Sequence, residues 1–67
     1  MKYRQYKIRH FDTKEIMVAW LDHPRMQPGD TFTIKDDAIE GHWTVVERYG
    51  LSDKADLYKP WRVGGIV

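Results

Sequence analysis

The stretch that decides the fold runs from Pro28 to Arg48 and reads PGDTFTIKDDAIEGHWTVVER. Its first two residues suit the central positions of a type II turn, because proline fixes φ at about −65° and the glycine accepts a positive φ. Thr31–Lys35 then alternates between polar and apolar residues, and His42–Arg48 is rich in β-branched and aromatic residues. Both patterns are typical of strands. The stretch therefore predicts a β-hairpin with the acidic connector Asp36–Glu40 at its tip.

The size and composition of the chain limit what it can be. A length of 67 residues predicts a single domain spanning residues 1–67. Cysteine is absent, which excludes disulfides, iron–sulfur clusters, thiol nucleophiles and thiolate-bound zinc. Three Trp, four Tyr and two Phe must then supply much of the core. With a net charge of +1, the molecule as a whole has no strong electrostatic preference for nucleic acid.

A first hairpin is predicted upstream, from residues 3–11 and 15–21 joined by a turn at Asp12–Lys14. The second of these segments is apolar on both faces, which predicts a central strand covered on both sides. A helix is the alternative for residues 15–21, because Asp12 and Glu15 have capping-box spacing and Ile16 and Trp20 are four residues apart. We favour the strand, since the segment is short for a helix and follows a strand-like partner across a tight turn.

The C-terminal part predicts a helical turn and a fifth strand. Residues 52–58 suit one helical turn capped by Ser52, with Leu57 and Tyr58 closing over one end of the fold. Pro60–Val63 reads as a short strand, and residues 64–67 are either its continuation or a tail. Five short strands with one helical turn before the last predict an all-β, small five-stranded barrel, in which closure removes exposed edges.

This order of elements resembles the SH3-like barrels across nearly the whole chain. The sequence is also similar to short accessory proteins of bacteriophages and prophages at Asp12-Thr13, Pro28-Gly29-Asp30 and Trp43-Thr44-Val45-Val46. That resemblance implies a small binding protein and transfers no catalytic residue. No apolar run approaches the roughly 20 residues that span a bilayer, and no signal-peptide pattern is present. We therefore expect a cytoplasmic protein, in the host cytoplasm if it is encoded by a phage.

No pattern in the sequence predicts catalysis, a metal or a cofactor. His10, His23 and His42 match no metal-ligand spacing. Ser52 lacks the glycine pattern of a nucleophile elbow and is better explained as a helix cap. The carboxylates of the acidic connector have no surroundings that would make one an acid and another a base. We expect a protein that is not an enzyme and has no metal or cofactor site.

The tryptophans divide between core and surface. Trp20 and Trp43 fall inside predicted strands and are expected in the core. Trp61 follows a proline and lies beside Tyr58 and Arg62 in the chain. It is either a plug over the end of the barrel or an aromatic shelf on which an extended peptide docks.

These observations favour a non-enzymatic protein-binding module that docks on a larger protein or self-associates. The C-terminal segment holds more large apolar residues than so small a barrel is expected to hide, namely Trp61, Val63, Ile66 and Val67. Aromatic residues and arginine dominate binding hot spots. The predicted contact residues are therefore Tyr58, Trp61 and Arg62, with Phe11 and Arg9 as a second edge. A self-complementary patch would give a two-fold dimer through residues 60–67.

Nucleic-acid binding is the alternative function. It would combine phosphate contacts from basic side chains with stacking on an exposed ring, as small barrels that bind single strands do. The balanced overall charge counts against it. The residues predicted for this alternative are Lys7, Arg9, Phe11, Arg48, Lys59 and Arg62.

Overall fold

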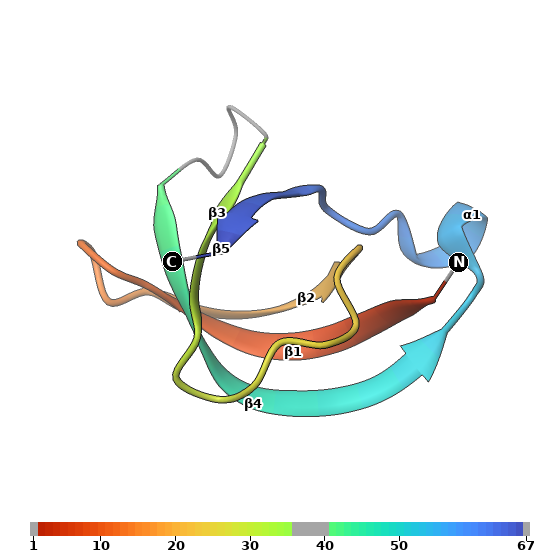
Figure 1. Ribbon diagram of the computed structural model, residues 1–67, viewed down its shortest axis with the longest axis horizontal. Coiled ribbons are helices and arrows are strands. Elements are labelled where there is room, and N and C mark those ends of the chain that lie inside the picture. The colour runs from red at the N-terminus through yellow and green to blue at the C-terminus, as the bar shows by residue number, and fades with distance from the viewer. Residues whose placement is uncertain (1, 36–40, 67) are drawn as a thin grey trace.

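The computed structural model describes residues 2–35 and 41–66, which form one strongly curved antiparallel sheet and a short helix (Figure 1). The elements are β1 (Tyr3–His10), β2 (Ile16–Leu21), β3 (Thr31–Ile34), β4 (His42–Ser52), α1 (Ala55–Tyr58) and β5 (Val63–Ile66). The strand order in the sheet is β2-β1-β4-β3-β5. The predicted all-β, five-stranded fold with a short helix before the last strand is confirmed.

Both predicted hairpins are present. β1 pairs with β2 and β3 pairs with β4, each in antiparallel register, and pairing of β1 with β4 joins the two hairpins. Residues 16–21 form a strand, so the helix alternative for this segment is wrong. The acidic connector Asp36–Glu40 lies outside the described residues. β5 begins at Val63 rather than at residue 60, and Gly64–Ile66 continue that strand.

The turn that precedes β3 has the predicted type II character. Gly29 has a φ of 96°, a conformation that suits glycine. The N–H of Asp30 donates to the carbonyl of Gln27 at 3.0 Å, which closes the four-residue turn. The N–H of Gly29 then donates to the carbonyl of Val45 at 2.8 Å, so the turn is attached to β4 as well as to β3.

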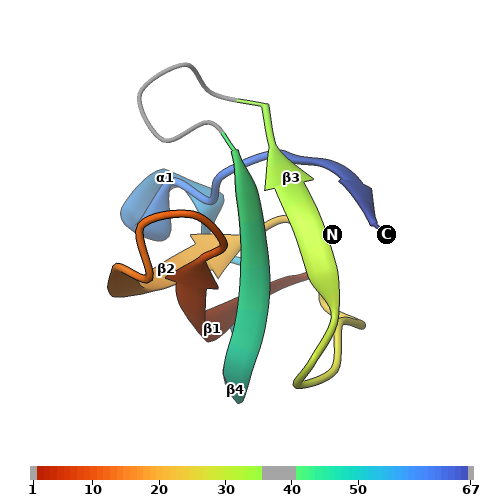
Figure 2. The ribbon, with the colours of Figure 1, turned by 90° about the vertical axis from the view of Figure 1, so that its left-hand side faces the viewer.

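The curvature of the sheet comes from β1 and β4. Their pairing shifts register twice, between Arg4 and Tyr6 and again between Lys7 and Ile8. Irregularities of this kind increase the local twist and bend the strands. As a result the 11-residue β4 curves enough to pair with β1 along most of its length and with β3 at its start (Figures 1 and 2).

The curved sheet closes at one point, where Trp61 meets the end of β2. The N–H of Trp61 donates to the carbonyl of Trp20 at 2.8 Å, and the N–H of Asp22 donates to the carbonyl of Trp61 at 3.1 Å. Leu21 and Trp61 thereby form a parallel bridge between the two edges of the sheet. The Asp22 side chain adds a further bond, because its Oδ1 accepts the N–H of Val63 at 2.8 Å.

Side chains that alternate along the strands fill the barrel. The buried core consists of Tyr6, Ile8, Ala19, Leu21, Met26, Phe32, Ile34, Trp43 and Val45. Trp43 is in the core as predicted. The prediction for Trp20 is wrong, because Ala19 and Leu21 on either side of it point inward and strand alternation turns Trp20 outward.

β2 is an edge strand of the sheet, which corrects the prediction of a central strand covered on both sides. Its inner face packs on the core through Ala19 and Leu21, while its outer face leaves Ile16 and Val18 exposed. An apolar pattern on both faces of a strand does not distinguish a covered face from an uncovered one. The difference depends on which other segment lies over the strand.

The predicted cap of the short helix α1 by Ser52 is wrong. Oγ of Ser52 accepts the N–H of Lys54 at 3.1 Å, and Lys54 precedes the first helical residue, so this bond orders the turn before the helix and satisfies none of its N–H groups. Leu57 does not close the barrel end, because 66% of its surface is exposed. Tyr58 instead packs against the outer side of β2, as described below.

Candidate protein-binding surface

The outer face of β2 carries an uncovered row of apolar side chains. Ile16 and Val18 are exposed over 54% and 53% of their surface, and Trp20 continues the row. All three point outward for the same reason, because side chains two apart on a strand share a face. Large apolar side chains that are grouped rather than scattered are the feature that distinguishes binding surfaces.

The row ends in an aromatic stack. The rings of Trp20 and Tyr58 have their centroids 4.1 Å apart with an angle of 19° between their planes. α1 holds Tyr58 in place, since the N–H of Tyr58 donates to the carbonyl of Lys54 at 3.1 Å. We call Ile16, Val18, Trp20 and Tyr58 the outer apolar surface.

Basic residues of β1 border this surface. Arg9 lies opposite Ile16 in the register of β1 and β2, and Lys7 lies opposite Val18. On its other side Lys7 lies opposite Glu47 of β4, whose charge offsets its own. Arg9 is exposed and lies opposite Thr44 on that side. Arg9 is therefore an exposed arginine at the rim of the outer apolar surface.

The five residues predicted to bind protein are not all on one surface. Tyr58 belongs to the outer apolar surface and Arg9 borders it. Phe11 is exposed beyond the end of β1, with the Nζ of Lys14 5.2 Å from its ring centroid. Trp61 packs against the core at the closure point, and the carbonyl of Arg62 accepts the N–H of Lys35 at 2.9 Å.

The C-terminal apolar residues do not form the patch expected from their number. Trp61 and Val63 are partly buried and packed against the core, as the plug interpretation of Trp61 predicts. Ile66 is exposed at the end of β5, and Val67 lies outside the described residues. β2 and α1 carry four exposed large apolar side chains of the described residues, and three others lie singly elsewhere. The four are Ile16, Val18, Leu57 and Tyr58, and the three are Phe11, Leu51 and Ile66.

The six residues predicted for nucleic-acid binding are dispersed as well. Lys7 and Arg9 share the outer face of β1, with Phe11 beyond its end. Arg48 faces the loop after β2, where its guanidinium donates to Oε1 of Gln27 at 3.2 Å. Lys59 and Arg62 belong to the segment between α1 and β5.

Ile16, Val18 and Trp20 are the residues of this surface that the sequence analysis missed, since it assigned Trp20 to the core. The sequence did contain a signal for them, namely the apolar residues on both faces of this short strand. Such a strand is either central in the sheet or has one face left for a partner. Tyr58 and Arg9 were predicted from residue type, because aromatic residues and arginine dominate binding hot spots. The same criterion passes over aliphatic residues.

The loop between β2 and β3 is fixed by side chains from β1 and β4. Nε of Arg4 donates to the carbonyl of Pro24 at 2.8 Å, and the guanidinium of Arg48 donates to Oε1 of Gln27. The hydroxyl of Tyr6 donates to the carbonyl of His23 and accepts the N–H of Met26 at 3.2 Å. Burial raises the pKa of Tyr6, and the bond from Met26 partly offsets that increase. Arg4 and Arg48 therefore stabilise this loop, and we do not expect them to bind a ligand.

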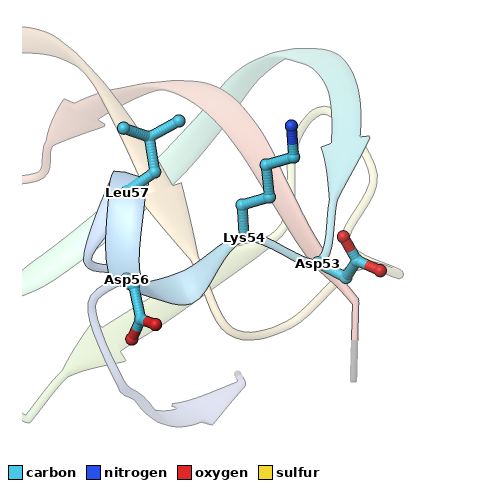
Figure 3. A pocket seen from close by; sticks show the side chains of 4 residues that line it. All are labelled: Asp53, Lys54, Asp56 and Leu57. Carbon is cyan, nitrogen blue, oxygen red and sulfur yellow. The ribbon is translucent and has the colours of Figure 1, made fainter.

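A shallow hollow lies beside α1 and is lined by Asp53, Lys54, Asp56 and Leu57 (Figure 3). Asp56 points to the opposite side from Lys54 and Leu57, so the polar groups do not converge on one position. Within residues 2–35 and 41–66 no group of three potential metal-ligating side chains occurs. In the same part of the chain, no helix has the length and apolar character needed to cross a membrane.

No family model, curated protein or solved structure matched this chain. The functional argument therefore rests on the chemistry of its own surfaces.

Proposed function

We propose that this chain is a non-enzymatic protein-binding module that docks through the outer apolar surface on another protein. The observation that carries the proposal is the row formed by Ile16 and Val18, each more than half exposed, leading into the stack of Trp20 and Tyr58. On the resemblance of three short stretches alone, we place it among phage-type accessory factors of the host cytoplasm.

The energetics of the surface support binding. Full burial of an isoleucine or valine side chain contributes about 1.5–3 kcal/mol, and the half of each side chain that is exposed here would become buried under a partner. Tryptophan and tyrosine are the residue types that dominate hot spots. Arg9 at the rim offers a charged hydrogen-bond donor beside an apolar centre, which is the usual arrangement of an interface.

The test compares proteins recovered from a host lysate by the wild type and by the double variant Ile16→Thr, Val18→Thr. Threonine keeps the β-branched shape and the strand preference but removes apolar surface. We expect binding of the specific partner to weaken by about 2 kcal/mol, or roughly 30-fold. The readout is the intensity of each recovered protein, followed by titration of the purified partner.

Leu51→Thr is the matched control, because Leu51 is half exposed at the far end of β4. The control should recover the same proteins as the wild type. Equal recovery by all three chains, with circular dichroism showing that each is folded, would rule out the outer apolar surface.

A further inference from the structure

We propose that a second copy of this chain pairs with the open edge of β2, its own β2 running antiparallel to the first about a two-fold axis at Met17. The inference rests on the proposed function, since it names a partner for the same strand, and it adds the mode of binding. That mode is strand addition through backbone hydrogen bonds, with the outer apolar surface contributing beside them.

The first step is to identify which backbone groups of β2 are open. In an antiparallel pair, the N–H and C=O of one residue point to the same side, and successive residues alternate between sides. The carbonyl of Trp20 and the N–H of Asp22 point away from β1, because both bond to Trp61. Counting back by two, the N–H and C=O of Ile16 and Val18 face the same open edge. Within the described part of the chain, no strand pairs with them there.

The second step is that β2 lacks the features that usually protect an edge strand. Charged side chains, prolines and bulges keep natural edges from pairing with other chains. β2 reads IMVAWL and pairs with β1 without a register shift, so it has none of the three. The other edge strand, β5, has two glycines among its four residues, which weakens it as a template.

The third step is that Trp61 fixes the register. It occupies the edge of β2 from Trp20 to Asp22, so an added strand reaches only Ile16 and Val18. When the added strand is another β2, the register that uses both residues sets Ile16 opposite Val18 of the second copy. Each such pair exchanges both N–H···O bonds. Setting Val18 opposite itself would require the carbonyl of Trp20, which is already bonded to Trp61.

The fourth step is that this register opposes no like charges. Glu15 comes opposite Ala19 of the second copy, and Lys14 lies before the strand, with a φ of 65°, so it does not extend along the edge that Trp61 occupies. On the outer face, Ile16 and Val18 of both copies form one apolar group. Lys7 and Arg9 flank this group, separated from their counterparts by three strand spacings, roughly 14 Å. That distance exceeds the Debye length of about 8 Å at physiological salt, so their repulsion is screened.

The first experiment uses the absence of cysteine from the chain. In the proposed dimer the Met17 residues of the two copies lie opposite each other and exchange no backbone hydrogen bonds. Their Cα atoms are then about 4.5 Å apart, a separation that a disulfide can bridge. Under mild oxidation Met17→Cys should become a covalent dimer that reductant dissolves. Ile16→Cys is the matched control, since its counterpart is offset by two residues and lies roughly 9 Å away, too far for a disulfide.

The second experiment is sedimentation equilibrium of the wild type, Val18→Pro, Val18→Lys and Leu51→Thr. The wild type and Leu51→Thr should shift with concentration from 8.0 kDa toward twice that mass. Val18→Pro should stay at 8.0 kDa, because it removes an N–H that faces the open edge and no bond to β1. Val18→Lys should also stay monomeric. This second variant keeps the test decisive if the proline variant does not fold.

A wild type that stays monomeric up to about 1 mM would overturn the inference. So would dimers that form equally in both Val18 variants, or equal cross-linking at positions 16 and 17. If the wild type is monomeric but the Ile16→Thr, Val18→Thr variant loses a protein that the wild type captures, the outer apolar surface binds that protein and not a second copy. In that case the inference fails while the proposed function stands.

Discussion

Tyr6 shows how a single residue of this protein joins the core to a loop. Its ring is fully buried, and its hydroxyl both donates to the carbonyl of His23 and accepts the N–H of Met26. Burial raises the pKa of Tyr6, because the charged phenolate would lose its hydration. Folding therefore favours the neutral phenol. The stability that this preference contributes is present below about pH 10 and is lost as the pH rises through the higher pKa of the folded state.

We expect the wild type to lose stability as the pH rises above about 10, and Tyr6→Phe to lose less over the same range. At neutral pH, Tyr6→Phe should be about 1–3 kcal/mol less stable, because the Met26 N–H loses its acceptor. Urea unfolding at several pH values measures both effects. The variant is needed because a hydrogen bond to Glu47 also raises the pKa of Tyr49, so a tyrosine absorbance titration would not isolate Tyr6. Identical pH dependence in the two chains would contradict this account.

At the scale of elements, the turn before β3 depends on one backbone conformation. Gly29 has a φ of 96°, and no atom beyond its two chain neighbours lies within 4 Å of where a Cβ would be. The cost of Gly29→Ala is therefore backbone strain alone, about 1–2 kcal/mol. A loss of 1 kcal/mol lowers Tm by about 4–8 °C in a domain of this size. Thermal unfolding followed by circular dichroism measures the shift.

Gly50→Ala is the matched control for that turn. Gly50 also has nothing within 4 Å of a Cβ position, and its φ lies outside the positive range. Alanine there should leave Tm nearly unchanged or raise it slightly, since it stiffens the unfolded chain. Equal destabilisation by the two substitutions would mean that the conformation of Gly29 does not limit stability.

The local elements and the all-β, five-stranded fold were predictable from the sequence, but the position of β2 in the sheet was not. Turn chemistry at Pro28-Gly29 and alternation at Phe32 and Ile34 are short-range signals, and both hairpins followed from such signals. The edge position of β2 depends on β1 pairing with β4 and on Trp61 meeting Leu21, contacts between residues about 40 apart in the chain. Hence Trp20 was placed in the core and Ile16 and Val18 were missed as surface residues. Tyr58 was found by residue type rather than by position.

At the scale of the whole molecule, closure of the sheet depends on Asp22 as well as on Trp61. Backbone bonds join Trp61 to Trp20 and Asp22, and the Asp22 carboxylate accepts the N–H of Val63 at 2.8 Å. These contacts connect the N-terminal hairpin to the C-terminal strand. They also leave the open edge of β2 with only Ile16 and Val18. The closure point therefore serves the fold and limits the surface available to a partner.

Asp22→Ala should destabilise the protein by about 1–3 kcal/mol, because the partly buried N–H of Val63 loses its acceptor. Asp22→Asn keeps an acceptor oxygen and loses only the charge, so its cost should be smaller. Thermal unfolding gives the order of stability. Amide hydrogen exchange locates the effect, since the N–H groups of Trp61 and Val63 should exchange faster in Asp22→Ala while that of Ile8, deep in β1, changes only with global stability. If alanine and asparagine cost the same and the Trp61 amide keeps its protection, the Asp22 side chain does not hold the barrel closed.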